Sequence, residues 1–217
     1  MARALVFDPN IILLDEPLSN LDFKLRESMR IELKALQIRT GVTTIYVTHD
    51  QIEAMVLSDK IILMNNGKIV QIGTPLEIYN HPKSKFVVDF IGKTNSVIGK
   101  IKEITTDSCL ISATEANDQT VRCKVPNAEV KKGDQVVLSI RPEDVNLNQE
   151  VAEPKENVWL GKIRNAHYLG NQWDYIVKVG KELLWVSVPV SLKRFQIGDK
   201  VNVALNSNGI MVWENNT

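Results

Sequence analysis

The chain has 217 residues, of which 44% are hydrophobic and 24% charged, a composition typical of a globular protein with one or two domains. Its 26 basic and 26 acidic residues cancel, which argues against a generally basic surface and against nucleic acid as a partner. Two cysteines are too few for a disulfide framework and favour a reducing compartment. No uninterrupted apolar run exceeds that of residues 11–14, which is far shorter than the ~20 residues of a membrane helix, and the N-terminus lacks a signal-peptide pattern.

Residues 1–92 alternate short apolar runs with helical periods. The runs at 10–14 (NIILL) and 42–48 (VTTIYVT) predict two strands buried on both faces of a parallel sheet. Between them, Asp22 is expected to cap a helix of about 18 residues that closes at Gly41. The remaining predicted elements are a short helix capped by Asp50, a hairpin turning at 65–67, and helices at 75–80 and 83–91. This order indicates an α/β fold.

From residue 93 onward the pattern becomes one of short strands separated by turns. It indicates a small β-barrel or a pair of barrels. Residues 131–136 and 195–201 echo each other, since each places a Gly-Asp turn before a strand, and the polar stretch 149–157 is expected to link two similar units. The predicted strands are 97–104, 109–113, 120–125, 135–140, 158–166, 173–179, 183–188, 200–205 and 210–213.

Two adjacent carboxylates follow the first predicted strand. Asp15 can orient Mg²⁺, usually through water, beside a nucleotide phosphate. Glu16 can polarise an attacking water as a general base. His49, at the end of the neighbouring predicted strand, can donate a hydrogen bond to a γ-phosphate. This combination predicts a site for phosphoryl chemistry at one edge of the sheet.

These residues resemble the nucleotide-binding subunit of ABC transporters. Residues 13–17 (LLDEP) match its Walker B strand, residues 19–22 (SNLD) its D-loop, with Asn20 where Ala is usual, and residues 48–50 (THD) its switch-histidine loop. The resemblance implies catalytic roles for Glu16 and His49. It also implies that Asp15, Ser19 and Asp22 lie at the nucleotide, with Asp15 on the metal ion.

The C-terminal part resembles the accessory regulatory barrel of importer ATPases for maltose, polyamines, iron and related solutes. Its most recognisable segment is residues 139–144 (SIRPED), and the pattern is closest to the polyamine-type and iron-type importers. The resemblance implies the second half of a P-loop-type nucleotide-binding domain over residues 1–92, followed by an all-β domain of two OB-like units over residues 93–217. It further implies a homodimer, transmembrane permease subunits as partners, and a cytoplasmic place on the inner face of the membrane.

The phosphate loop of that family is absent from these 217 residues. The motif needs G-x-x-x-x-G-K-[ST], and although Gly92, Lys93 and Thr94 stand in line, Val87 occupies the place of the earlier glycine. Because no backbone cradle holds the phosphates, we expect the chain alone to bind ATP weakly and not to hydrolyse it. ATP and Mg²⁺ are expected as cofactors of a full-length parent.

Two other interpretations remain open. The chain could act as a non-catalytic dimerisation or regulatory module whose barrel domain is the working part, or as a solute-sensing barrel of the kind that binds oxyanions. Four tryptophans at 159, 173, 185 and 213 are expected in the barrel core or in an interface between two copies. His81 and His167 lack the context of His49 and are expected to be structural.

Overall fold

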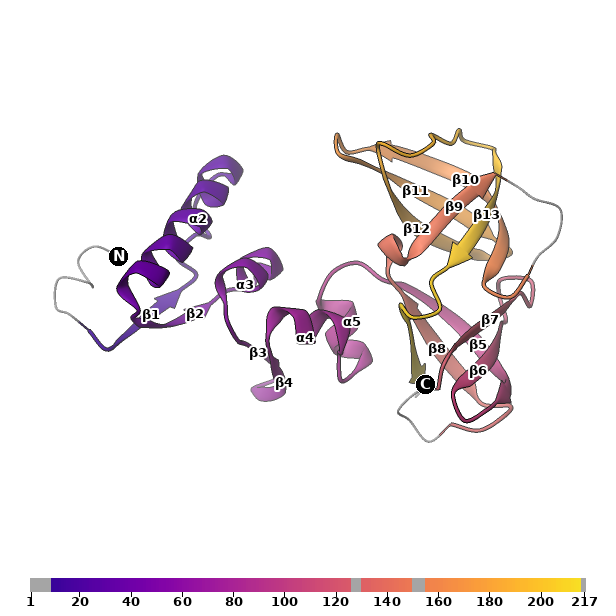
Figure 1. The fold of residues 1–217 in the computed structure, drawn as a ribbon, viewed down its shortest axis with the longest axis horizontal. Helices are drawn as coiled ribbons and strands as arrows, with labels where there is room; N and C mark the ends of the chain where they lie inside the picture. The colour runs from indigo at the N-terminus through magenta and orange to yellow at the C-terminus, as the bar shows by residue number, and fades with distance from the viewer. Residues whose placement is uncertain (1–8, 126–129, 150–154, 216–217) are drawn as a thin grey trace. The chain divides into compact units, whose positions relative to one another are not determined.

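The computed structural model describes residues 9–125, 130–149 and 155–215. The chain divides into two compact units, Met1–Gly92 and Lys93–Thr217, which are described separately (Figure 1). No helix among the described residues is long and apolar enough to cross a membrane. The predicted polar linker at 149–157 overlaps residues 150–154, which lie outside the described residues.

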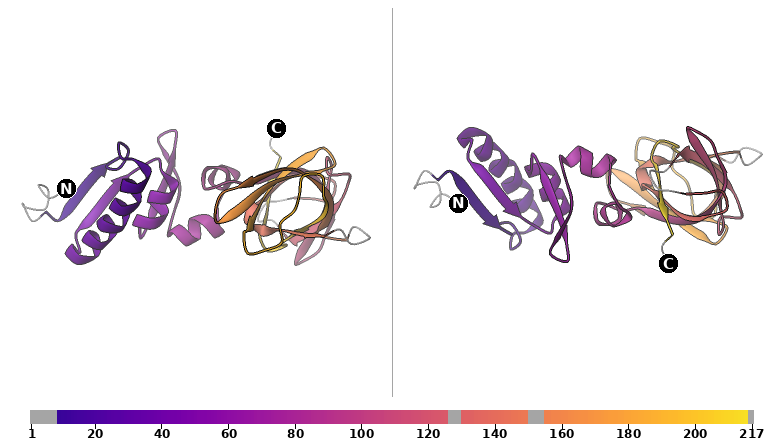
Figure 2. Two further views of the ribbon diagram at one scale, coloured as in Figure 1. Left: turned by 90° about the horizontal axis from the view of Figure 1, so that it is seen from above. Right: turned by 90° about the horizontal axis from the view of Figure 1, so that it is seen from below.

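The first unit opens with a parallel strand pair joined by a helix. Strands β1 (Ile11–Asp15) and β2 (Thr43–Val47) pair with Ile11 opposite Thr43 and Asp15 opposite Val47. The crossover is α2 (Phe23–Thr40), which lies along the strand pair in Figure 2. As predicted, the Asp22 carboxylate accepts the Leu25 N–H at the start of α2, and Gly41 ends it in the left-handed conformation at φ 66°.

The expectation that both strands are buried on both faces is wrong for this chain. Ile12 is buried, but Leu13 is 72% exposed and Ile45 is 52% exposed. Leu33 on α2 packs with Leu18 and Leu57, so the helix covers one face of the pair. Among the described residues, nothing covers the opposite face. The apolar runs therefore belong to strands with one bare face.

The rest of the first unit is a hairpin with short helices. Helix α3 (Gln51–Leu57) begins at Asp50, and strands β3 (Ile61–Asn65) and β4 (Lys68–Gly73) turn through Asn66 and Gly67, both with positive φ, as Asn-Gly hairpins do. Helix α4 (Pro75–Asn80) starts with a Thr74–Glu77 capping box. Helix α5 (Lys85–Phe90) is shorter than the predicted 83–91 because Ser84 caps it.

The second unit contains two antiparallel five-stranded sheets whose strands appear in the orders β14-β8-β5-β6-β7 and β12-β11-β10-β13-β9. Every predicted strand is present within a few residues, and one was missed: β9 (Val145–Gln149), which follows the short 3-10 helix η1 (Pro142–Asp144). The two sheets share one continuous apolar core. The other strands are β5 (Asn95–Ile104), β6 (Ser108–Ala113), β7 (Thr120–Lys124), β8 (Gln135–Ile140), β10 (Val158–Tyr168), β11 (Gln172–Val179), β12 (Glu182–Pro189), β13 (Lys200–Leu205) and β14 (Ile210–Glu214).

The echo in the sequence corresponds to a structural repeat. Gly133 and Gly198 have φ of 97° and 98°, and each donates a hydrogen bond of 2.9 Å to the first strand of its own set, at Ile101 O and Ile163 O respectively. After each set of four strands the fifth strand crosses over, since β9 pairs with β13 while β14 pairs with β8. The two OB-like sheets are therefore interlocked by an exchange of their last strands.

Two asparagines hold the edge strands of these sheets. Asn95 in β5 accepts the Trp185 N–H at 2.7 Å and donates to the Trp185 carbonyl at 2.8 Å. Asn157, just before β10, does the same to the peptide of Arg122, at 2.6 and 2.9 Å. Trp185 lies on edge strand β12 and Arg122 on edge strand β7, so each amide satisfies backbone groups that an open edge would leave exposed.

The tryptophans divide between the core and the surface. Trp159 is fully buried and its indole N–H donates to the Thr120 carbonyl at 3.0 Å, so it belongs to the core. Trp213 donates to the Ser139 hydroxyl. Trp185 is 39% exposed.

Candidate functional site

The site is built where β1 and β2 end. The parallel register sets Asp15 opposite Val47, and the Glu16 N–H then donates to the Val47 carbonyl at 2.9 Å. Glu16 has φ 43°, a left-handed conformation that is uncommon for a residue other than glycine and that ends the strand sharply. Such strain is found at functional sites more often than elsewhere. The two loops that follow the strands are thus brought side by side.

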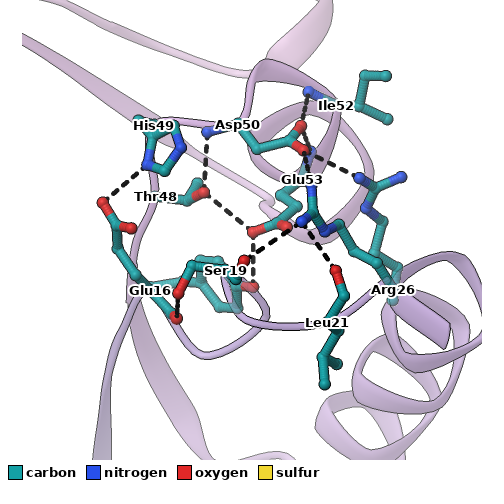
Figure 3. Close-up of polar contacts among 11 residues, drawn as sticks. Glu16, Ser19, Leu21, Arg26, Thr48, His49, Asp50, Ile52 and Glu53 are labelled. Atoms are coloured by element: carbon teal, nitrogen blue, oxygen red, sulfur yellow. Dashed lines mark hydrogen bonds and ion pairs between the residues drawn. The ribbon is translucent and has the colours of Figure 1, made fainter. Parts of the chain in front are cut away.

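Glu16 and His49 contact each other directly (Figure 3). The Glu16 Oε1 atom lies 2.8 Å from His49 Nδ1, and both side chains are open to solvent, at 42% and 75% exposed. The hydrogen bond with Glu16, together with the charge of that carboxylate, raises the pKa of His49 above its ordinary value. The structure therefore brings together the two residues for which the sequence indicated catalytic roles.

Asp15 is exposed at the end of β1. Among the described residues, no group of three or more histidine, cysteine or acidic side chains could hold a metal ion. The donor set therefore does not fit a metal cage built from protein alone. It fits Mg²⁺ that Asp15 would hold through water, since Mg²⁺ usually keeps several waters when it is bound beside nucleotides.

Ser19 and Asp22 use their side chains within the loop. The Ser19 hydroxyl donates to the Glu16 carbonyl at 2.9 Å, and the Asp22 carboxylate accepts the Leu25 N–H at 3.0 Å. Both contacts shape the turn from β1 into α2. Ser19 therefore contacts Glu16 through the Glu16 carbonyl, whereas Asp22 caps α2.

A layer of polar residues beneath the site was not found from the sequence. Glu53 is only 2% exposed and accepts hydrogen bonds from the hydroxyls of Tyr46 and Thr48, both at 2.9 Å. Burial and the hydrogen bond to Glu53 raise the pKa of Tyr46. The available signal was the spacing of Glu53 and Leu57, which places a carboxylate on the buried face of α3.

Asp50, which the sequence marked only as a helix cap, is also an ion-pair partner. Its carboxylate lies 3.0 Å from Arg30 Nη2 and 3.6 Å from Arg26 Nη1. Burial alone would raise the pKa of Asp50, but the backbone hydrogen bonds from α3 and the charge of Arg30 outweigh burial and lower it. Asp50 therefore stays ionised beside His49.

Comparisons with known proteins match part of the second unit to a domain family and most of the chain to named relatives. Residues 138–213 match the family described as TOBE domain. The relatives of this chain, over most of its length, are import ATP-binding proteins. The chain is thus a homologue of the ATP-binding proteins of ABC importers and, like the C-terminal part of such a protein, carries a TOBE domain.

The relatives carry a more specific name, "Spermidine/putrescine import ATP-binding protein PotA". The protein of that name from Chromobacterium violaceum is 42% identical over 210 residues, covering 94% of this chain and 57% of its own length. Those from Trichodesmium erythraeum and Borreliella afzelii are 44% and 40% identical, covering 82% and 98% of this chain and 48% and 56% of theirs. The chain spans about half the length of the curated relatives it matches.

A solved structure of the cytoplasmic molybdate-binding protein ModG aligns with 55% of this chain and 95% of its own length, at 13% identity and a TM-score of 0.46. We draw nothing about function from a likeness at this level.

Proposed function

We propose that this chain is part of the ATP-binding subunit of an ABC importer, in which ATP hydrolysis drives the uptake of a small solute. The observation that carries the proposal is the 2.8 Å contact between Glu16 and His49 at the ends of two parallel strands, in a chain 42% identical to an import ATP-binding protein. The names of the relatives point to linear polyamines as the solute class.

In this proposal residues 1–92 are the second half of a P-loop-type nucleotide-binding domain, and residues 93–217 are its regulatory barrel domain with two OB-like units. Glu16 accepts a proton from the attacking water, because its carboxylate is exposed and lies beyond the end of β1. His49 keeps Glu16 oriented through the Nδ1 contact and presents its other ring nitrogen to the γ-phosphate. Mg²⁺ held near Asp15 would neutralise phosphate charge. Ser19 and Asp22 are proposed to border the nucleotide once ATP is bound.

The proposed partners follow from the same family. They are transmembrane permease subunits, which would hold the protein at the inner face of the membrane, and a second copy of the chain. The exposed face of Trp185 supports an interface between two barrels, whereas Trp159 lies in the core and does not. Sedimentation of the chain at tens of micromolar tests the dimer, and a monomer there would contradict it.

The catalytic roles can be tested in a chimera. It joins this chain to the portion of a relative that lies outside the region aligned with this chain. We expect Glu16→Gln and His49→Ala each to lower the rate of ATP hydrolysis by about 10²–10⁴-fold. His81→Ala is the matched control, since His81 is also exposed but ends α4. The 217-residue chain alone is expected not to hydrolyse ATP. Full hydrolysis by either site variant would overturn the assignment.

A second candidate is a non-catalytic regulatory or solute-sensing module. The observation in its favour is that the second unit has a continuous closed core, whereas the first exposes one face of its strand pair. Binding of a small solute to the chain, with the chimera inactive, would favour this function.

A further inference from the structure

One side chain joins the two loops of the candidate site. Arg26, in the first turn of α2, donates from Nη2 to the carbonyls of Ser19 at 3.3 Å and Leu21 at 3.0 Å. Its Nη1 atom lies 3.6 Å from the Asp50 carboxylate. Figure 3 shows the guanidinium between the loop that follows β1 and the loop that follows β2. A single rigid group therefore touches both loops.

Asp50 transfers this contact to His49. One carboxylate oxygen accepts hydrogen bonds from the N–H groups of Ile52 and Glu53 at 2.8 and 3.1 Å. The other oxygen forms the ion pairs with Arg26 and Arg30. The Asp50 N–H itself donates to the Thr48 hydroxyl at 2.9 Å. Because both the backbone and the side chain of Asp50 are held, the residue before it in the chain has little freedom to move.

Thr48 is fixed from beneath by the buried Glu53. The Thr48 hydroxyl donates to Glu53 Oε2 and accepts from Asp50, which uses its single proton and one acceptor position. His49 therefore lies between two residues whose positions are set by hydrogen bonds. Direct contacts therefore connect the Ser19 carbonyl to Arg26, Arg26 to Asp50, and Asp50 to Thr48, and His49 is the residue between the last two.

We propose that Arg26 is a positioning residue for the Glu16–His49 pair, which couples the loop of residues 19–21 to the loop of residues 48–50. The proposal rests on the proposed function and adds to it a residue whose contacts are with the Ser19 and Leu21 carbonyls and the Asp50 carboxylate. A displacement of the Ser19 or Leu21 carbonyl would shift the guanidinium, move Asp50, and change the distance between Glu16 and His49.

Arginine is suited to this role and lysine is not. The guanidinium is a planar fork with five donors, which can serve two carbonyls and a carboxylate at once. A lysine ammonium on a flexible stem keeps the charge but has no fixed geometry. The variant Arg26→Lys therefore separates geometry from charge, while Arg26→Met removes both.

The direction in which the pKa of His49 changes distinguishes a loss of charge at Arg26 from a loosening of the contact with Glu16. The charged groups that act on His49 are Glu16 from the end of β1 and Asp50 and Glu53 beside or on α3, while Arg26 and Arg30 on α2 lie against the Asp50 carboxylate. Loss of the Arg26 charge alone would raise the pKa of His49, since a nearby cation disfavours protonation. Loosening of the contact with Glu16 would lower it, because that contact holds the pKa up.

The experiment is an NMR pH titration of His49 in the 217-residue chain. Glu16→Gln is expected to return the pKa of His49 to near its ordinary value of about 6.5. Arg26→Lys is expected to lower it, because the Glu16 contact loosens while the charge is kept, and Arg26→Met is expected to lower it by a smaller amount, because the lost charge acts in the opposite direction. The control is Lys34→Met. Lys34 lies on the same helix as Arg26 but pairs with Asp59, so its loss should leave the pKa of His49 unchanged.

The outcomes separate the two proposals. If Glu16→Gln lowers the pKa and both Arg26 variants leave it unchanged or raise it, the pair stands and the positioning role of Arg26 is overturned. If Glu16→Gln has no effect, the pair itself is absent in solution and the proposed function loses its main support. The amide shifts of β3 check that unit 1 remains folded, and if Arg26→Met unfolds it, the milder Arg26→Lys decides.

Discussion

The two units of this protein differ in how far the apolar faces of their sheets are buried. In the first, β1 and β2 form a two-stranded sheet with one apolar face bare, at Leu13 and Ile45 among others. In the second, ten strands form two sheets that exchange their last strands and share one core. The candidate catalytic residues lie in the first unit. The site therefore lies in the unit that buries less apolar surface. Specific polar contacts must hold its side chains in place.

The largest expected effect is a difference in local stability between the units. Amide hydrogens of β5 and β10 are expected to exchange at least about a thousandfold more slowly than those of β1 and β2, because only the former lie in a shared core. Hydrogen exchange with mass spectrometry on the whole chain measures this. Residues 93–217 expressed alone should retain the slow amides. Equal protection in the two units would erase the contrast.

Much of the fold could be predicted from the sequence, because the decisive signals are local. The caps Asp22 and Asp50, the Asn66-Gly67 turn and the repeated Gly-Asp turns all act within a few residues along the chain, and each was found. Strand β9 was missed because its sequence VNLNQ is half polar and follows a turn-like Pro-Glu-Asp segment. The exchange of fifth strands is a non-local pairing that no local pattern reveals.

The candidate site divides in the same way. Glu16 and His49 could be predicted because their motifs lie at strand ends, and parallel strands end at the same edge of a sheet. Arg26 and Glu53 could not, since an arginine and a glutamate on predicted helices are normally solvated. The role of Arg26 arises from its ion pair with Asp50 on another element, and that of Glu53 from its hydrogen bonds with Tyr46 and Thr48 at the turn from β2 into α3, contacts that only the folded chain shows.

A smaller effect is expected from shortening one leucine in each unit. Leu138→Ala in β8 removes a fully buried side chain and is expected to cost about 2–5 kcal/mol of unfolding free energy. Leu13→Ala in β1 removes an exposed one and should cost less than about 0.5 kcal/mol. Urea unfolding can follow the units separately by tryptophan fluorescence and by the circular dichroism of helices, since all four tryptophans lie in the second unit and the α-helices of the described residues lie in the first. Similar costs would show that burial does not distinguish the two sheets.

The asparagine contacts at the edges should contribute less than the core. Asn95→Ala and Asn157→Ala each remove hydrogen bonds to a peptide on an edge strand and are expected to cost about 1–3 kcal/mol. The control is Asn148→Ala on β9, where the side chain is exposed and a change under about 0.5 kcal/mol is expected. Tryptophan fluorescence in urea gives all three values. If Asn95→Ala matches the control, the amide does not hold the edge.

The smallest expected effect is a pH dependence of the second unit that arises from Asp174. Its side chain is only 5% exposed and lies 3.3 Å from Lys93 Nζ. Burial alone would raise the pKa of Asp174, but hydrogen bonds from Ser187, Gln172 and Lys93 outweigh burial and lower it. Because the folded-state pKa lies below the unfolded one, this carboxylate stabilises the fold above about pH 4. That contribution is lost as the pH falls through the folded-state value.

Asp174→Asn therefore has an effect that depends on pH. It keeps the size of the side chain and an acceptor for Ser187 but removes the charge that pairs with Lys93, so a loss of about 1–2 kcal/mol is expected at pH 7. Below the folded-state pKa of Asp174 the difference from the parent chain should shrink toward zero, because the parent carboxylate is then protonated as well. Urea midpoints at pH 7 and at a pH below the folded-state pKa of Asp174 measure both values. The matched control is Asp107→Asn, at an exposed position before β6, for which less than about 0.5 kcal/mol is expected at either pH. A loss of equal size at both pH values would assign the effect of Asp174 to packing instead of charge.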